Sequence, residues 1–310
     1  MIRVKNLTKT YGELKAVDDV TFDVHTGEIL GFLGPNGAGK TTTVRIITCY
    51  MPPTSGSVEV DNLSVFENSL EVRKKIGYLP ESAPLYSEMS VLDYLRFIMG
   101  LRGIEKSRWD QRTKEITETC ALGSVLRRNI GELSKGYRQR VGLAQAMVHD
   151  PEILILDEPT SGLDPNQIVE IRSLIKELGK EKTVILCSHI LPEVEATCGR
   201  VLIINEGKIV ADGSPVELQA SFQGRERIYL EIKAPLQDIQ TRLAKVEHVE
   251  KVEQIAANGD DLKKFAIECT RGVDLREKIF RLAVENNWVL LEMRKEQVSL
   301  EDVFRQLTTS

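Results

Sequence analysis

Hydrophobic positions near the start of the chain follow patterns that predict three strands and a helix. Residues 2–5 and 20–24 alternate between apolar and polar, and the branched apolar run 29–33 has the length of a buried strand. After a glycine-rich turn, residues 40–50 have helical spacing and end before two prolines. A further strand is expected at 58–60.

From about residue 84 to 148 the pattern is almost wholly helical. Leu92 and Leu95 share one predicted face, and Leu143 and Met147 share another. This block predicts a helical subdomain inserted into the preceding fold.

Strands and helices alternate after this block, which favours a parallel sheet with crossover helices. The expected strands are 153–156, 183–187 and 200–205, with a helix at about 166–178 and a short one before the last strand.

A polar stretch near 221–227 predicts a boundary between a domain at 1–222 and a smaller one at 225–310. The second region has the element order βαββαβ, which predicts a small ferredoxin-like α+β module. Ser299, followed three residues later by Asp302, predicts the start of a last helix. The expected strands are 228–232, 246–255, 262–269 and 289–293, with helices around Leu236 to Leu243 and 273–286.

Length and composition limit the possible classes. A chain of 310 residues is long enough for two domains, and 28% charged with 42% hydrophobic residues is typical of a globular protein. A net charge of −5 gives no general attraction to nucleic acid. No run approaches the roughly 18–20 apolar residues of a membrane span, and Met1 opens no export signal, so a cytoplasmic chain is expected. The five cysteines and four histidines lack metal-ligand spacing and predict free thiols.

A phosphate-binding motif lies between the buried strand and the helix. Glycines at its fixed positions let backbone N–H groups surround a phosphate, Lys40 neutralises the β- and γ-oxygens, and Thr41 is placed to ligate Mg²⁺. A plain glycine turn between strand and helix is the alternative, but the full pattern in this context favours ATP and Mg²⁺. The residues concerned are Gly34, Pro35, Asn36, Gly37, Ala38, Gly39, Lys40, Thr41 and Thr42.

Two carboxylates, Asp157 and Glu158, end the apolar strand that begins at Ile153. Ligands of open α/β sheets bind at this end of the strands. One carboxylate can hold Mg²⁺ while the other orients a water molecule. A strand ending in Asp-Glu is common, so the pair gains meaning from the phosphate loop.

Together these motifs resemble those of an ATP-binding-cassette (ABC) ATPase, and the resemblance covers about the first 220 residues. It implies a P-loop NTPase fold of the ABC-ATPase type with an inserted helical subdomain. Ser134 and Gly136 match the signature loop, while Lys135 and Tyr137 depart from its commonest form. The remaining matches are Tyr11 with the adenine-stacking aromatic, the segment 161–164 ending in Asp164 with the D-loop, and Ser188-His189 with the switch histidine.

Each single residue also has a structural interpretation. Tyr11 could serve only in packing at a strand edge, and a lone histidine such as His189 is more often structural. Ser134 and Gly136 could form a helix N-cap, which is compatible with binding ATP. At the family's usual glutamine this chain has Glu81, which keeps an oxygen ligand for Mg²⁺ but adds negative charge.

The resemblance implies two copies that enclose two ATP molecules, so the active unit is a dimer, expected to be a homodimer. In it Glu158 polarises the attacking water, Asp157, Thr41 and Glu81 hold Mg²⁺, and His189 senses the γ-phosphate. It also implies an integral-membrane permease that docks near Glu81 and residues 84–97 and keeps the chain on the inner face of the membrane. The C-terminal segment resembles ATPases of ABC-2-type exporters, and the stretch 133–171 is most similar to the gliding-motility-associated subfamily.

Two alternatives remain open at this point. A soluble ABC ATPase acting on translation or chromosomes is the rival function, although the single phosphate loop, the absence of heptads and the nearly balanced charge after residue 225 favour transport. The C-terminal module could instead bind a regulatory ligand or mediate dimerisation, because a ferredoxin-like fold does not determine function.

Overall fold

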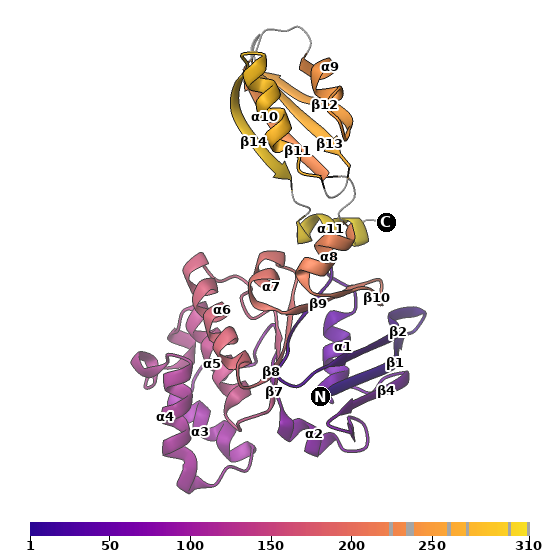
Figure 1. Cartoon of the computed structure of the whole chain (residues 1–310). Helices are drawn as coiled ribbons and strands as arrows, with labels where there is room; N and C mark the ends of the chain where they lie inside the picture. The colour runs from indigo at the N-terminus through magenta and orange to yellow at the C-terminus, as the bar shows by residue number, and fades with distance from the viewer. Residues whose placement is uncertain (223–225, 234–238, 259–261, 271–272, 297–298, 309–310) are drawn as a thin grey trace. The chain divides into compact units, whose positions relative to one another are not determined.

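The computed structural model describes residues 1–222, 226–233, 239–258, 262–270, 273–296 and 299–308 (Figure 1). The chain forms two compact units. One consists of Met1–Pro215 together with Phe304–Ser310, and the other of Val216–Val303. The assignment of functional domains to 1–222 and 225–310 stays a prediction. Within the described residues, no helix combines the length and the apolar character that crossing a membrane requires.

The centre of the first unit is a six-stranded sheet with the order β10-β9-β3-β8-β7-β6. Its strands run parallel except β10, which pairs antiparallel with β9, so the predicted parallel sheet is confirmed. The hydrophobic pattern of the sequence predicts neither β6 nor β10. The strands are β3 (Ile29–Leu33), β6 (Ile76–Leu79), β7 (Ile153–Asp157), β8 (Thr183–Ser188), β9 (Arg200–Asn205) and β10 (Lys208–Gly213).

A second, antiparallel sheet has the order β2-β1-β4-β5. Its buried valines and isoleucines share one core with α1 and with the central sheet. The predicted helix at 40–50 is shorter than expected, because the chain leaves α1 at Ile47 and Cys49 adopts a left-handed backbone with φ 60°. The elements are β1 (Ile2–Tyr11), β2 (Leu14–Val24), β4 (Ser55–Val60), β5 (Leu63–Ser64) and α1 (Lys40–Ile47).

Helices form the remainder of this unit, and Figure 1 shows α3, α4 and α5 grouped on the side away from β1, β2 and β4. Leu95 and Met99 of α3, Ile116 of α4 and Leu143 of α5 are buried, as expected for a packed helical subdomain. The helices are α2 (Ser69–Lys75), α3 (Val91–Leu101), α4 (Trp109–Thr119), α5 (Lys135–Met147), α6 (Pro165–Gly179), α7 (Leu191–Thr197) and α8 (Pro215–Phe222), the last crossing the limit between the units.

The second unit has the predicted ferredoxin-like arrangement, with four antiparallel strands in the order β12-β13-β11-β14. Two helices supply Ile239, Leu243 and Ile279 to its core, whereas Leu236 lies outside the described residues. Ser299 and Asp302 form the predicted reciprocal cap of α11. The elements are β11 (Glu226–Lys233), α9 (Ile239–Ala244), β12 (Val249–Asn258), β13 (Leu262–Cys269), α10 (Arg276–Glu285), β14 (Val289–Glu296) and α11 (Leu300–Thr308).

Candidate functional site

The phosphate-binding loop joins β3 to the first turn of α1. Gly39, the N-cap, has φ 109° and offers no side-chain hydrogen bond to the helix N-terminus, so first-turn N–H groups are left for a ligand. At Gly34 a Cβ would lie 2.4 Å from the Ile204 carbonyl oxygen, so only glycine fits between this loop and β9. Ala38 is buried, and its carbonyl accepts a hydrogen bond from the Gly207 N–H at 3.0 Å. Contacts with β9 and with the turn that follows it therefore hold the loop in place.

Lys40 lies inside the curve of this loop. Its side chain is 7% exposed, and Nζ donates to the carbonyl oxygens of Gly34 at 2.6 Å and Pro35 at 3.2 Å. A buried ammonium needs such acceptors to offset the loss of water. Because both acceptors are neutral carbonyls, an anionic phosphate at the loop would attract the same ammonium more strongly.

Asp157 ends β7 next to the first turn of α1. Its Oδ2 accepts a hydrogen bond from Thr41 Oγ1 at 3.2 Å, while Oδ1 is buried with no hydrogen-bond partner. Burial raises the pKa of this carboxyl, and the charges of Glu158 and Glu81 raise it further. Crowded carboxylates with an unused oxygen beside a hydroxyl fit the hard oxygen ligands that Mg²⁺ takes. No group of three or more His, Cys, Asp or Glu among the described residues has the arrangement of a metal site, so other ligands would have to complete it.

Glu158 forms a pair with His189. Its backbone turns out of β7 with φ 50°, an uncommon conformation for this residue type, and its N–H donates to the Cys187 carbonyl oxygen at 2.9 Å. The Glu158 Oε1 lies 2.8 Å from His189 Nδ1, and Oε2 is buried without a partner. His189 is half exposed and Glu158 is buried, so the imidazole covers the carboxylate on the solvent side.

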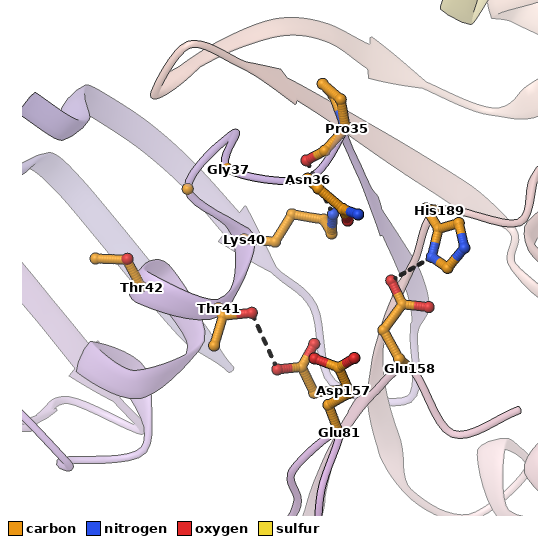
Figure 2. Close-up of a pocket in the computed structure, with 11 residues that line it drawn as sticks. Pro35, Asn36, Gly37, Lys40, Thr41, Thr42, Glu81, Asp157, Glu158 and His189 are labelled. Carbon is orange, nitrogen blue, oxygen red and sulfur yellow. Dashed lines mark hydrogen bonds and ion pairs between the residues drawn. The ribbon is translucent and has the colours of Figure 1, made fainter. Parts of the chain in front are cut away.

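These groups enclose one cavity of about 190 Å³, shown in Figure 2. The phosphate loop lies on one side, and the carboxylates and His189 lie opposite it. A polar cavity with a lysine, a helix N-terminus and an acid pair can bind a polyphosphate and activate water beside it. The lining residues are Pro35, Asn36, Gly37, Gly39, Lys40, Thr41, Thr42, Glu81, Asp157, Glu158 and His189.

The other predicted site residues do not line this cavity. Tyr11 is 45% exposed at the end of β1, and its hydroxyl lies 3.1 Å from Met51 Sδ. Ser134 caps α5 through the Tyr137 N–H at 3.4 Å, and Asp164 caps α6 through the Gln167 N–H at 3.0 Å.

Gly136 also lies away from the cavity and packs against Gln167 of α6. A Cβ at Gly136 would lie 2.7 Å from the Gln167 side chain. This contact ties the signature loop to the helix that follows the D-loop. Ser134 therefore forms the predicted helix N-cap. Ser134 and Gly136 could contact a nucleotide only if it is bound by a second copy of the chain.

Two buried polar residues that do not line the cavity are not predicted from the sequence. Thr160 Oγ1 donates to Glu193 Oε2 at 2.6 Å, and both side chains are at most 2% exposed. Thr160 lies in the turn after β7 and Glu193 lies in α7, 33 positions further along the chain, so periodicity gives no sign of their contact. Only the presence of polar residues inside apolar surroundings could have pointed to them.

Comparison with known proteins gives a single family. The "ABC transporter" family model matches residues 17–161. The chain is 36% identical over 309 residues to the "Bacitracin transport ATP-binding protein BcrA" of Bacillus licheniformis, covering 99% of this chain and 97% of that protein. It is 29% identical to the "Linearmycin resistance ATP-binding protein LnrL" of Bacillus subtilis, covering 99% and 98%. This chain belongs to the family of ABC transporter ATP-binding proteins.

Solved structures agree with this assignment. A "Dimeric Structure of MJ0796, a Bacterial ABC Transporter Cassette" has a TM-score of 0.64 at 28% identity and covers 69% of this chain and 98% of its own. A second structure of that cassette, in a post-hydrolysis state bound to ADP and Pi, gives the same values. The chain is thus an ATP-binding and ATP-hydrolysing subunit of an ABC transporter, and no comparison supports the translation or chromosome alternative.

Proposed function

We propose that this chain powers an ABC-2-type exporter, hydrolysing ATP while bound to an integral-membrane permease. The observation that supports ATP hydrolysis is the cavity, which is lined by Lys40, Asp157, Glu158 and His189. Export is supported by the two relatives that match nearly the whole chain, because their names describe bacitracin transport and linearmycin resistance. Likeness to the gliding-motility-associated subfamily stays a prediction about the finer subclass.

In the proposed reaction, Lys40 exchanges its two carbonyl acceptors for phosphate oxygens. Thr41, Asp157 and Glu81 would hold Mg²⁺, which neutralises phosphate charge when bound. The unpartnered Asp157 Oδ1 supports this ligand set, because a buried acceptor without a donor favours a cation. Glu81 lines the same cavity and supplies an oxygen where the family usually has an amide.

Glu158 would accept the proton of the attacking water, and His189 would orient this base. The 2.8 Å contact between His189 Nδ1 and Glu158 Oε1 supports the pairing, and Oε2 has no hydrogen-bond partner. Binding of the γ-phosphate beside the half-exposed His189 would give its ring a second partner. The side chain can then report whether the phosphate is present.

A second copy would complete the nucleotide site. Ser134, Gly136 and Asp164 lie outside the cavity of their own chain, at the ends of α5 and α6. The N-terminus of α5 carries partial positive charge that suits a phosphate of the partner's nucleotide. Tyr11, exposed at the end of β1, is proposed to stack on the adenine of its own chain's ATP.

The permease is proposed to dock at a groove of about 420 Å³ beside Glu81's loop. Arg45, Arg73 and Arg102 line it, and no Asp or Glu does. Among the ion pairs of the described residues none involves these arginines, and burial with the nearby Arg73 charge lowers the pKa of Arg102. An uncompensated cluster of this kind fits a cytoplasmic segment of the permease that carries a carboxylate. Exposed Tyr50 at the rim, with Tyr86 and Phe97 of the predicted 84–97 docking stretch, would supply apolar contacts.

For the smaller region at 225–310 we propose an accessory role in the assembly. The bacitracin and linearmycin proteins also have this region, because each matches 99% of this chain. The proposed place of the chain is the cytoplasmic face of the membrane, held there by the permease, with no nucleic-acid partner.

The test is affinity purification of tagged Glu158→Gln protein from detergent-solubilised native membranes with ATP and Mg²⁺, followed by mass spectrometry. A multi-span membrane protein is expected, and the Arg73→Glu/Arg102→Glu variant should recover much less of it. Arg108→Glu, an exposed arginine outside the groove, is the matched control and should recover the normal amount. Recovery of ribosomal or chromosomal proteins, with the chain wholly in the soluble fraction, would contradict the proposal.

A further inference from the structure

Glu193 is a buried carboxylate that the proposed chemistry does not use. It lies in α7 and is 2% exposed, and no Lys, Arg or His within the described residues forms an ion pair with it. A lone buried carboxylate is costly unless its oxygens accept hydrogen bonds. Its partners therefore indicate what the position is for.

Those partners are hydroxyl groups from two segments, the turn after β7 and the end of β8. Glu193 Oε2 accepts from Thr160 Oγ1 at 2.6 Å and from Ser188 Oγ at 3.4 Å. Ser188 Oγ in turn accepts the Ile190 N–H at 3.0 Å, which fixes the hydroxyl in place. Thr160 and Ser188 are both buried, so neither hydroxyl is exchanged for water. Glu193 thus links the turn after β7 to the last residue of β8 through one oxygen atom.

Both hydroxyls are close in sequence to the catalytic pair. Thr160 follows Glu158 by two residues, and Ser188 directly precedes His189. In front of the link, His189 Nδ1 and Glu158 Oε1 are 2.8 Å apart. Glu158 also holds a left-handed backbone, with φ 50°, a conformation that its surroundings must maintain.

We propose that Glu193 is a positioning residue, which holds the Glu158 and His189 loops together from inside and so sets the geometry of the base. This inference rests on the proposed roles of Glu158 and His189. The link continues beyond the pair, because the Thr160 carbonyl accepts the Leu163 N–H at 3.1 Å in the turn that leads to Asp164. Loss of the link would let the two loops separate without removing any group that binds ATP.

The test compares kcat and KM of purified variants with the affinity for a non-hydrolysable ATP analogue. Glu193→Ala and Thr160→Val, which remove one side of the link each, should lower kcat by about 10- to 100-fold, because small misplacements of a catalytic group are that costly. Thr160→Ser keeps the hydroxyl and should lose far less than Thr160→Val. Analogue affinity should stay within about threefold of wild type. Glu195→Gln, exposed on the same helix, is the control and should keep normal kcat.

A double-mutant cycle separates positioning from general stability. In a His189→Ala background, Glu193→Ala should cause little further loss of kcat, because the pair that it positions is already broken. The inference would be overturned if the losses of kcat caused by His189→Ala and Glu193→Ala multiply in the double variant. A normal kcat in Glu193→Ala alone would also overturn it. If Glu193→Ala does not fold, the Thr160→Val and Thr160→Ser pair decides by the same criterion. Normal hydrolysis by Glu158→Gln or His189→Ala would instead contradict the proposed catalytic roles.

Discussion

Asp157 is placed to bind a cation, and this placement lowers the stability of the nucleotide-free protein. Its carboxylate is buried beside two other acids, and its pKa is raised above the ordinary 3.8. A raised pKa means that the folded state disfavours the ionised form, so stability is lost as the pH rises through the folded-state pKa. Near neutral pH that cost is present in full, and a bound cation would relieve it.

Asp157→Asn should therefore raise the melting temperature of the nucleotide-free protein at pH 7. A gain of about 1 kcal/mol corresponds to roughly 2–4 °C for a domain of this size. The gain should shrink as the pH falls toward the raised pKa, and the stabilisation by ATP with Mg²⁺ should disappear. Scanning calorimetry with and without nucleotide measures both effects. A variant that is less stable at pH 7 yet still stabilised by ATP with Mg²⁺ would contradict this account.

The sequence predicts most of the residues that line the cavity but not the buried polar residues that hold the neighbouring segments in place. The phosphate loop and the acid pair are local in sequence, so fixed spacing identifies Lys40, Thr41, Asp157 and Glu158. Thr160 and Glu193 are brought together only by the parallel pairing of β7 and β8, which no local pattern encodes. Long-range contacts of polar side chains are therefore what a single sequence conceals.

The strands and helices follow their local patterns wherever the surroundings are apolar on both sides. The buried strand β3 begins and ends at the predicted residues, because continuous branched apolar runs are typical of parallel strands. The sequence pattern does not predict strand β10, since it is an edge strand without buried residues that pairs only with β9. Likewise β6 contains a glycine, Gly77, where a Cβ would lie 2.2 Å from the Ala146 carbonyl oxygen. Close packing between elements, not strand propensity, explains that position.

The junction between α5 and β6 depends on a neutral histidine. His149 Nε2 lies 3.1 Å from the Ile76 carbonyl oxygen, and Nδ1 is buried without a partner. Burial, and next the charge of Arg102, lower the pKa of His149 from 6.5 to about 4. The unfolded chain takes up a proton below pH 6.5 that the folded chain accepts only near pH 4, so stability falls across this window.

We predict that His149→Gln flattens this acid-side loss. The wild type should lose up to about 1.4 kcal/mol of unfolding free energy per pH unit from this group between pH 6.5 and 4. The amide of glutamine can still donate to Ile76 but does not titrate. Urea unfolding at pH 7, 6 and 5 measures the slope, with His25→Gln, an exposed histidine, as the control. An unchanged slope in His149→Gln would contradict the assignment.

The two units of the whole molecule are not simply successive in sequence. The last seven residues, Phe304–Ser310, group with the first unit, and Asn205 Nδ2 donates to the Leu307 carbonyl oxygen at 3.4 Å. The sequence predicts a ferredoxin-like module followed by a terminal helix, because alternation and the Ser299 cap are local signals. It does not predict that residues after Val303 group with the ATPase unit, since no local pattern in α11 indicates which unit it packs against.

Removal of everything after Phe222 should therefore destabilise the ATPase unit, whereas deletion of 226–298 that keeps α11 on a flexible linker should not. The expected difference is about 1–3 kcal/mol, because the truncated form exposes the surface that the chain end covers. Thermal unfolding followed by circular dichroism compares the two, and both should still bind ATP. Equal melting temperatures would show that the terminal segment contributes nothing to the unit.

We propose that the cavity at Lys40 hydrolyses ATP with Glu158 as its base in a dimer of this chain. The most direct measurement is the ATPase rate of Glu158→Gln together with its mass in solution, with ATP and Mg²⁺ present and Glu195→Gln as the control. We expect hydrolysis about 10²- to 10⁴-fold slower than wild type and a stable ATP-bound dimer. Near-normal turnover, or a protein that stays monomeric with ATP, would contradict it.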